Sequence, residues 1–325
     1  MNRRTAIRRL ATFCLTTASL VHAQQPKKVP RIGFVSGTGD ADNPGPDIEA
    51  FRQGLRNLGY IEGENILVEY RYMGGIPDRS PILVADLVQL KVDVLVATVP
   101  SAISAAKQAT ETIPIVMVTS QDPVAAGIVD SLTRPGGNIT GLTRLTRQLS
   151  GKRLELFKEV VPTISRVGVL LVASPTSTSN YDATARALKI PLQALEVQRP
   201  NPDLEGAFET AAKDRVSALI TINNTALVPY AKKIADLAIK YRLPSMYERS
   251  DYVDAGGLVS YSADDVESYR HAAIYVDKIL KGTKPADLPV QQPMRFEFVV
   301  NLKTAKKIGV TINTDVLARA TKIIR

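Results

Sequence analysis

The chain has 325 residues, with 41 lysines and arginines against 32 aspartates and glutamates, a single cysteine and two histidines. The basic residues are scattered through helix-like segments and do not alternate with aromatic residues, so the composition gives no support to nucleic-acid binding. Its length exceeds what one compact core usually contains, which favours two domains.

The first residues have the pattern of an export signal. Four arginines between residues 3 and 9 precede an apolar stretch from Leu10 to Leu20 that is too short to span a bilayer. Val21-His22-Ala23 then forms a small-residue cleavage site before Gln24. We therefore expect residues 1–23 to be a signal peptide, cleaved after Ala23, and the mature protein to be periplasmic.

Cleavage would remove Cys14 and His22 and leave His271 as the one histidine of the mature chain. Cysteine nucleophiles, disulfides and thiolate metal sites are then excluded, and a histidine-containing triad would have to use His271. That residue falls off the apolar stripe of a predicted amphipathic helix, so we expect it at the surface.

The segment RIGFVSGTGD, Arg31 to Asp40, places Gly33, Gly37 and Gly39 in the spacing of a dinucleotide-binding loop. Gly33 lies inside the predicted strand, and the following acidic, proline-containing loop would repel a phosphate. No tyrosine has a lysine four residues later, as a short-chain dehydrogenase requires. We therefore expect no cofactor. Gly37 and Gly39 instead allow a tight turn whose backbone N–H groups face a ligand.

The first half of the mature chain alternates short apolar runs with helical patterns, which is typical of βαβ units and a parallel sheet. The predicted strands lie at residues 31–36, 65–72, 92–98, 113–119 and 138–143. The predicted helices lie at about 48–58, 79–90 and 101–110, and a connecting helix follows within 144–162.

The second half repeats this alternation. Its predicted strands lie at residues 166–174, 192–198, 217–223, 243–247 and 256–262, and its helices at about 181–188, 204–212 and 226–241. The two series predict an α/β protein with two Rossmann-like lobes, each built on a parallel sheet, and a ligand cleft between the lobes.

Ligands of open parallel sheets sit beyond the carboxyl ends of the strands, so the polar residues there are the candidate ligand-binding residues. They are small hydroxyls, backbone amides, side-chain amides and one carboxylate, suited to hydrogen bonds with a small polar solute. The predicted set is Ser36, Gly37, Thr38, Thr98, Ser101, Thr119, Ser120, Asp122, Ser174, Asn223, Asn224 and Tyr247.

The same residue types are the usual helix caps and turn residues, so each candidate has an alternative interpretation. Asp122, before Pro123, either caps a short helix or pairs with a ligand ammonium group. Tyr247 is expected to reach the solute from the second lobe. The set lacks a nucleophile paired with a base, which argues against an enzyme. The aspartates between residues 40 and 47 lack the spacing of a calcium loop, so no metal is expected.

Three segments resemble one family of proteins. QDPVAAGIVDSLTRPGGNITGLT (Gln121 to Thr143), KRLELFKEVVP (Lys152 to Pro162) and the stretch from Ala272 to Ile312 are similar to ABC-transporter substrate-binding proteins of the tryptophan and tyrosine type. The resemblance implies a periplasmic-binding-protein type I fold that closes on a solute and delivers it to a permease in the inner membrane.

The resemblance also implies how the chain is divided. The first lobe would contain residues 29–145 and about 257–288, and the second lobe residues 146–256 and about 289–325. We expect a monomer that binds a small polar solute, with an amino acid or aromatic compound as one possibility. The alternatives are a ligand-sensing subunit for a receptor and, from another class, a cofactor-dependent α/β enzyme.

Overall fold

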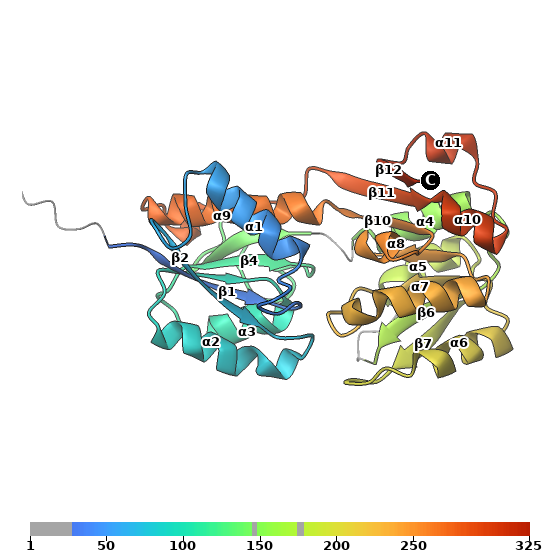
Figure 1. Ribbon diagram of the computed structural model, residues 1–325, viewed down its shortest axis with the longest axis horizontal. Helices are drawn as coiled ribbons and strands as arrows, with labels where there is room; N and C mark the ends of the chain where they lie inside the picture. The colour runs from blue at the N-terminus through green and yellow to red at the C-terminus, as the bar shows by residue number, and fades with distance from the viewer. Residues whose placement is uncertain (1–27, 145–147, 174–178) are drawn as a thin grey trace, which may run out of the picture.

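Two α/β lobes lie side by side in the computed structural model, which describes residues 28–144, 148–173 and 179–325 (Figure 1). Within these residues, the first lobe contains a five-stranded sheet of order β2-β1-β3-β4-β5, and every neighbouring pair of strands is parallel. Its strands are β1 (Arg31–Ser36), β2 (Leu67–Tyr72), β3 (Val94–Ala97), β4 (Ile115–Thr119) and β5 (Ile139–Thr143).

Helices cover both faces of the first sheet because its central strands are apolar on both sides. On one face lie α2 (Ser80–Gln89), after the short η1 (Pro77–Arg79), and α3 (Pro100–Ala109). On the other face α1 (Pro46–Asn57) packs beside α9 (Asp265–Leu280), although more than 200 residues separate them in the sequence.

The packing of α1 against α9 depends on a glycine. A Cβ atom at Gly54 would lie 2.8 Å from the Cβ of Ala273 and 2.8 Å from the carbonyl oxygen of Arg270. The two helices therefore touch backbone to backbone. Asp47 and Asp265, at the two N-termini, are thereby brought to the same end of the helix pair.

The second lobe contains a seven-stranded sheet of order β12-β11-β10-β9-β8-β6-β7 in the described ranges. Its strands are β6 (Val167–Val172), β7 (Leu192–Val197), β8 (Ala218–Thr221), β9 (Ser245–Tyr247), β10 (Val259–Ala263), β11 (Phe296–Asn301) and β12 (Lys322–Ile324). Strand β11 runs antiparallel to β10, which departs from the expected all-parallel sheet.

Helices again lie on both faces of this sheet. One core is formed with α4 (Ser150–Val160), α5 (Ser179–Ala187), α10 (Leu302–Ile308) and α11 (Thr314–Leu317). The opposite core is formed with α6 (Leu204–Lys213), η2 (Val228–Tyr230), α7 (Ala231–Lys240) and α8 (Asp251–Asp254). The remaining short helix, η3 (Pro285–Asp287), precedes β11.

The chain passes between the lobes at points that differ from the expected division. The sequence resemblance predicts that the chain returns to the first lobe near Gly257, which would place β10 in that lobe. This prediction is wrong because β10 pairs with β9 and β11 in the second sheet. The crossing comes at Asp264, and α9 then packs on the first lobe. Gln291 still bonds the backbone of Gly141, so the last crossing follows it.

Two further observations concern the position of His271 and the length and apolar character of the helices. His271 is half-buried on α9 and lies 2.9 Å from a carboxylate oxygen of Glu267, one turn earlier. Across the described part of the chain, no helix has the length and apolar character needed to cross a bilayer. The expected signal peptide, residues 1–23, lies outside the described residues.

Candidate functional site

The carboxyl ends of the strands of the two sheets, apart from β11 and β12, face each other (Figure 1). The loops that follow them make contact there, and we call this contact region the interlobe interface (Figure 1). A Cβ atom at Gly37, just after β1, would lie 2.9 Å from the Cγ2 atom of Thr225, after β8. Gly75, after β2, has a φ of 76°, and its Cβ position lies 3.1 Å from the carbonyl oxygen of Thr225. The glycines therefore permit close contact between the lobes.

The hydroxyl groups at the strand ends of the first lobe are held by turn and strand-end hydrogen bonds. Ser36 donates to the carbonyl oxygen of Thr38 at 2.7 Å, and Thr98 donates to the carbonyl oxygen of Val35 at 3.0 Å. The hydroxyl of Thr119 accepts the backbone N–H of Gln121 at 3.1 Å. Ser36, Thr98 and Thr119 are buried, so their first role is to shape the loops.

The remaining first-lobe candidates are more accessible. Thr38, Ser101 and Ser120 are half-buried and lie after three different strands, at the edge that faces the second lobe. Ser101, in the first turn of α3, accepts a hydrogen bond from Ser80 at 2.9 Å. These three residues remain candidates for ligand contact.

Asp122 has the geometry of a cap. Its Oδ1 atom accepts the backbone N–H groups of Val124 at 2.9 Å and Ala125 at 3.1 Å. The side chain is thereby committed to the turn after Pro123, which agrees with the capping interpretation. Pairing of Asp122 with a ligand ammonium group stays a prediction.

In the second lobe, Asn223 and Asn224 follow β8 and are half-buried beside Thr225 at the interface. The side-chain oxygen of Asn224 accepts the N–H of Ala226 at 2.9 Å. The backbone N–H of Asn223 donates to Glu248 at 2.9 Å. Ser174, the candidate after β6, lies outside the described residues.

The expectation that Tyr247 reaches a solute is corrected by its position. The ring is fully buried in the core of the second lobe and stacks on Tyr252 at a centroid distance of 5.0 Å. A Cβ atom at Gly257 would lie only 2.2 Å from the ring. Burial raises the pKa of Tyr247, which therefore stays protonated. It supports the sheet from inside and does not line the interface.

The two residues that follow Tyr247 were missed by sequence reasoning, and both form ion pairs. Glu248 is 7% exposed and accepts hydrogen bonds from Tyr181 at 2.7 Å and from the Nη1 atom of Arg153 at 3.1 Å. Arg153 also donates to the carbonyl oxygen of Tyr261 at 2.6 Å. This network joins α4, α5, β10 and the loop after β9, all within the second lobe.

Arg249 makes ion pairs on both sides of the interface. Its guanidinium lies 3.0 Å from Asp251 of its own lobe, 3.2 Å from Asp265 at the start of α9, and 3.7 Å from Asp47 at the start of α1. Asp265 also pairs with Arg144 at 3.0 Å. We call these five residues the interlobe charge cluster.

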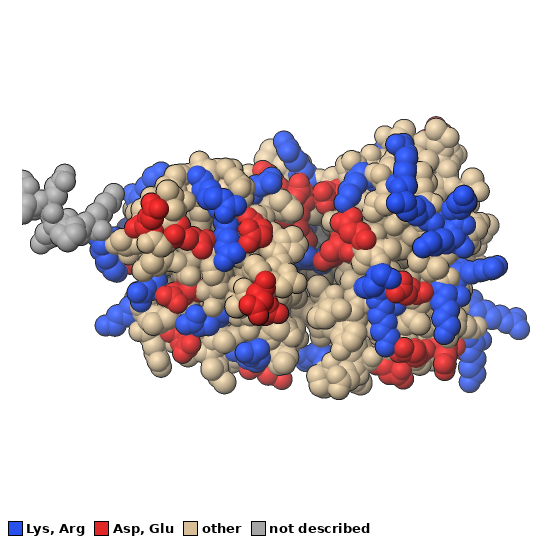
Figure 2. All heavy atoms as spheres, viewed as in Figure 1, with Lys and Arg blue, Asp and Glu red and all other residues tan. Residues whose placement is uncertain are grey.

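The interlobe charge cluster is largely shielded from water and contains more carboxylates than guanidiniums. The side chains of Arg144 and Arg249 are 7% and 12% exposed, and those of Asp47 and Asp265 are 19% exposed. Figure 2 shows acidic side chains gathered along the boundary between the lobes, on both of its sides, where the surface is hollowed.

This charge imbalance affects the carboxylates differently. Burial raises the pKa of Asp47, and the attraction of Arg249 only partly opposes it because Asp265 adds repulsion. Burial also acts to raise the pKa of Asp265, but Arg144 and Arg249 outweigh it and the pKa is lowered. Asp265 is therefore the well-compensated carboxylate, and Asp47 the poorly compensated one.

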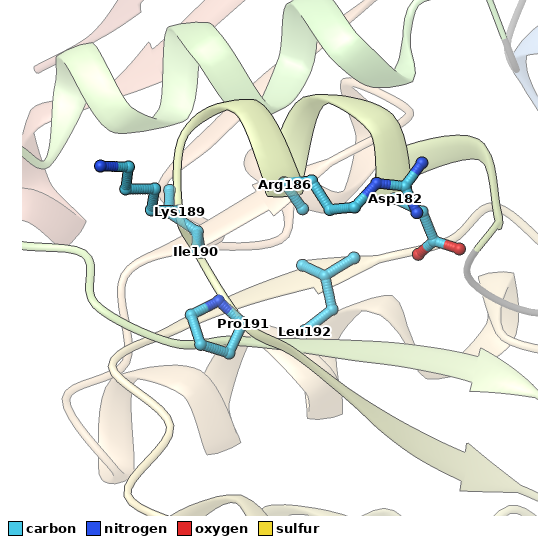
Figure 3. Close-up of a pocket in the computed structure, with 7 residues that line it drawn as sticks. Asp182, Arg186, Lys189, Ile190, Pro191 and Leu192 are labelled. Atoms are coloured by element: carbon cyan, nitrogen blue, oxygen red, sulfur yellow. The ribbon is translucent and has the colours of Figure 1, made fainter.

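Three pockets are found among the described residues, and two of them bear on the position of the candidate site. One, of about 470 Å³, is an open depression between the end of α5 and the start of β7, beside Arg186, Lys189, Pro191 and Leu192 (Figure 3). It lies at the amino end of β7, on the edge of the sheet opposite the candidate site. The other, of about 170 Å³, lies where the interlobe crossings meet.

The ranges that the structure describes contain no assembled metal site. No group of three or more histidine, cysteine, aspartate or glutamate side chains there is arranged to hold a metal ion. The guanidinium of Arg249 lies between the carboxylates of Asp251 and Asp265.

Two α/β lobes that face each other through the carboxyl ends of parallel strands, and that the chain enters more than once, define a periplasmic-binding-protein type I fold. The chain belongs to the ABC transporter substrate binding protein family, whose model matches residues 42–324.

Individual relatives agree with this assignment. A tyrosine-binding protein of Clostridioides difficile (strain R20291) is 24% identical over 273 residues, covering 80% of this chain and 75% of that protein. A conserved domain protein from Vibrio cholerae gives a TM-score of 0.80 at 28% identity, with 91% of this chain and all of that chain covered.

Two further structures share the fold and differ in state. The ABC domain from Streptococcus pneumoniae in complex with L-Trp gives a TM-score of 0.80 at 23% identity, covering 91% of this chain and 99% of that chain. A ligand-free, open substrate-binding protein from Clostridium difficile gives 0.65 at 21% identity, with the same coverage.

Proposed function

We propose that this protein is the extracytoplasmic solute-binding component of an ABC importer, and that it captures an aromatic amino acid between its lobes by closing on it. Closure buries the solute, and the closed form delivers it to the permease in the inner membrane. The protein acts as a monomer in the periplasm after residues 1–23 are removed.

The contact across the interlobe interface is the observation that carries this proposal. Gly37 and Gly75 of the first lobe lie against Thr225 of the second, at the edge where ligands of parallel sheets bind. A protein that closes on a solute needs opposed strand ends that approach this closely. The higher TM-score against the L-Trp complex than against the open, ligand-free structure supports the same interpretation.

The ligand class rests on the relatives and on the polar groups at the interface. One relative is named for tyrosine binding, and a structural neighbour holds L-Trp. In this chain, half-buried residues with hydroxyl and amide groups follow the strands at the edge where the lobes meet, and such groups suit the ammonium and carboxylate groups of an amino acid. They are Thr38, Ser101, Ser120, Asn223 and Asn224.

Isothermal titration calorimetry of the protein recovered from the periplasm tests the proposal, with L-tryptophan, L-tyrosine and L-phenylalanine as ligands. Glycine, indole and D-tryptophan are controls that lack the aromatic ring, the charged groups or the correct stereochemistry. We expect saturable binding of at least one aromatic amino acid. A hundredfold excess over Kd should also stabilise the fold by about 2.7 kcal/mol. Absence of binding by all three would reject the proposal.

Export is tested separately by N-terminal sequencing of the periplasmic protein. The expected first residue is Gln24 or its cyclised form, because cleavage follows Ala23. An intact Met1 on protein confined to the cytoplasmic fraction would contradict the periplasmic assignment.

A further inference from the structure

We infer that Arg249 permits closure by neutralising carboxylates that face each other across the interlobe interface, and so sets solute affinity without contacting the solute. This inference rests on the proposed function and adds a positioning residue to it. Asp47 and Asp265 belong to helices of the first lobe, and Asp251 belongs to the second. Arg249 lies between them.

The guanidinium is fixed to its own lobe. Its Nε and Nη2 atoms both lie 3.0 Å from the same carboxylate oxygen of Asp251, two residues further along the chain. A guanidinium is planar and always charged, so this fork leaves the Nη1 atom directed at a second group. Nη1 lies 3.2 Å from Asp265 and 3.7 Å from Asp47.

The two first-lobe carboxylates are held together by the fold. The contact of Gly54 with Ala273 presses α1 onto α9, and the first turn of each helix carries one of the aspartates. Helix N-termini stabilise negative charge, which partly offsets the repulsion between Asp47 and Asp265. When the lobes approach, this acidic pair meets the charge of Asp251, and Arg249 is the cation between them.

The negative charge of the carboxylates is not fully neutralised, so the inference predicts the direction in which each substitution changes closure. Asp265 is satisfied by Arg144 and Arg249, whereas burial raises the pKa of Asp47 and the contact with Arg249 at 3.7 Å opposes this only in part. Removing the charge of Asp47 should therefore leave closure unchanged or favour it. Removing the charge of Arg249 should oppose closure, because Arg144, paired with Asp265, is then the one arginine in the described ranges that forms an ion pair with any of the three carboxylates.

A direct role in binding the solute carboxylate is the competing interpretation of Arg249. The distances argue against it, because the guanidinium already faces three carboxylates that would repel another anionic group. The two interpretations predict different results for a double variant. Charge neutralisation predicts rescue by removal of a facing carboxylate, whereas a direct contact does not.

The experiment measures L-tryptophan affinity and dissociation rate for Arg249→Met, Asp47→Asn and their combination in the full chain. If the parent protein prefers tyrosine or phenylalanine, that amino acid replaces L-tryptophan as the probe. We expect Arg249→Met to weaken binding by on the order of tenfold, mostly through faster dissociation. Asp47→Asn should bind as the parent does or up to about threefold more tightly, and the double variant should recover at least about threefold of the loss.

Arg52→Met is the matched control. Arg52 is also a partly buried arginine between two carboxylates, at 2.6 Å from Glu49 and 3.5 Å from Glu62, but all three belong to the first lobe. The affinity of Arg52→Met for L-tryptophan should stay within about twofold of that of the parent. If Arg249→Met fails to fold, Arg249→Lys keeps the charge without the fork and should weaken binding by about threefold.

Three results would overturn the inference. They are a tenfold loss on Asp47→Asn, an unchanged affinity of Arg249→Met, and a double variant no better than Arg249→Met alone. These results are distinguishable from failure of the proposed function, in which the parent protein itself binds no aromatic amino acid.

Discussion

Glu248 and Arg249 are consecutive residues in one loop, yet their ion pairs lie in different regions of the molecule. The partners of Glu248 are all in the second lobe, where Arg153 and Tyr181 come from α4 and α5. The partners of Arg249 include Asp47 and Asp265 of the first lobe. A buried charge pair inside a lobe contributes to folding, whereas one between lobes contributes to their relative position.

The two regions also differ in how completely charge is compensated. The carboxylate of Glu248 receives hydrogen bonds from a guanidinium, a phenol and a backbone N–H. The interlobe charge cluster has three carboxylates for two guanidiniums. Charged groups that stay in contact can have all their charge paired. Charged groups that separate when the lobes open must also be stable without their partners across the interface.

Breaking the network inside the second lobe should have the largest effect on stability. Arg153→Met leaves Glu248 buried without its cation, which typically costs about 3 to 5 kcal/mol of unfolding free energy. Urea denaturation would measure this loss. The exposed pair of Lys232 and Asp236 supplies the control, and Lys232→Met should change stability by less than about 1 kcal/mol. Similar losses for both variants would contradict the distinction.

The glycine contact between the lobes should show itself in ligand affinity, because the stability loss on substitution should match that of a neighbouring glycine outside the contact. Gly75→Ala places a methyl group 3.1 Å from the carbonyl oxygen of Thr225 in the other lobe. Gly74→Ala is the control, since its φ of 62° carries similar strain but its Cβ position meets only Arg79, at 3.6 Å. We expect both to lose about 1 kcal/mol of stability, and Gly75→Ala alone to bind L-tryptophan about fivefold more weakly by calorimetry. Equal affinities would show that closure does not use this contact.

The pH dependence of stability should identify Asp47 as the poorly compensated carboxylate. Its native pKa is raised above the ordinary value of 3.8, so the native state binds a proton at a pH where the unfolded chain does not. The free energy of unfolding of the parent, measured relative to that of Asp47→Asn, should therefore rise as pH falls from 7 towards 3.8. It should fall again when the pH is returned to 7. Carboxylates far from the interlobe charge cluster are common to both proteins and cancel. A difference that shrinks on acidification would show that Arg249 compensates Asp47 fully.

The smallest effect is expected for Asp122→Asn. Asparagine retains a side-chain oxygen that can accept the N–H groups of Val124 and Ala125, so a capping residue tolerates this change. Affinity for L-tryptophan should stay within about threefold of the parent in calorimetric titration. A loss of tenfold or more would restore the ammonium-binding role that the sequence left open.

Much of the fold was predictable because apolar runs and helical stripes are local signals. The alternation placed β1 to β10 within a few residues and predicted the two lobes. The antiparallel position of β11 was not predictable from periodicity, since a strand has the same pattern in either direction. The lobe of β10 likewise depends on its pairing with β9 and β11.

The candidate site was predicted less well, for a physical reason. The end of a strand can be located from sequence, but the face on which a side chain lies depends on its neighbours. Tyr247 faces the core because Gly257 leaves room for its ring, although the next two residues reach charged partners. Those partners, Arg153, Asp47 and Asp265, are distant in sequence and become neighbours only through packing of α1 on α9 and α4 on the second sheet.

A distance measurement between the lobes tests the central claim most directly. Spin labels on Ile82→Cys in α2, whose side chain is 73% exposed, and on Lys232→Cys in α7 would report the separation in the processed protein, which loses Cys14 with residues 1–23. Double electron–electron resonance with saturating L-tryptophan should give one narrow, short distance distribution. Without ligand the distribution should be broader and longer, because closure is then not stabilised by the solute. Identical distributions under saturating ligand, with binding confirmed by calorimetry, would contradict capture by lobe closure.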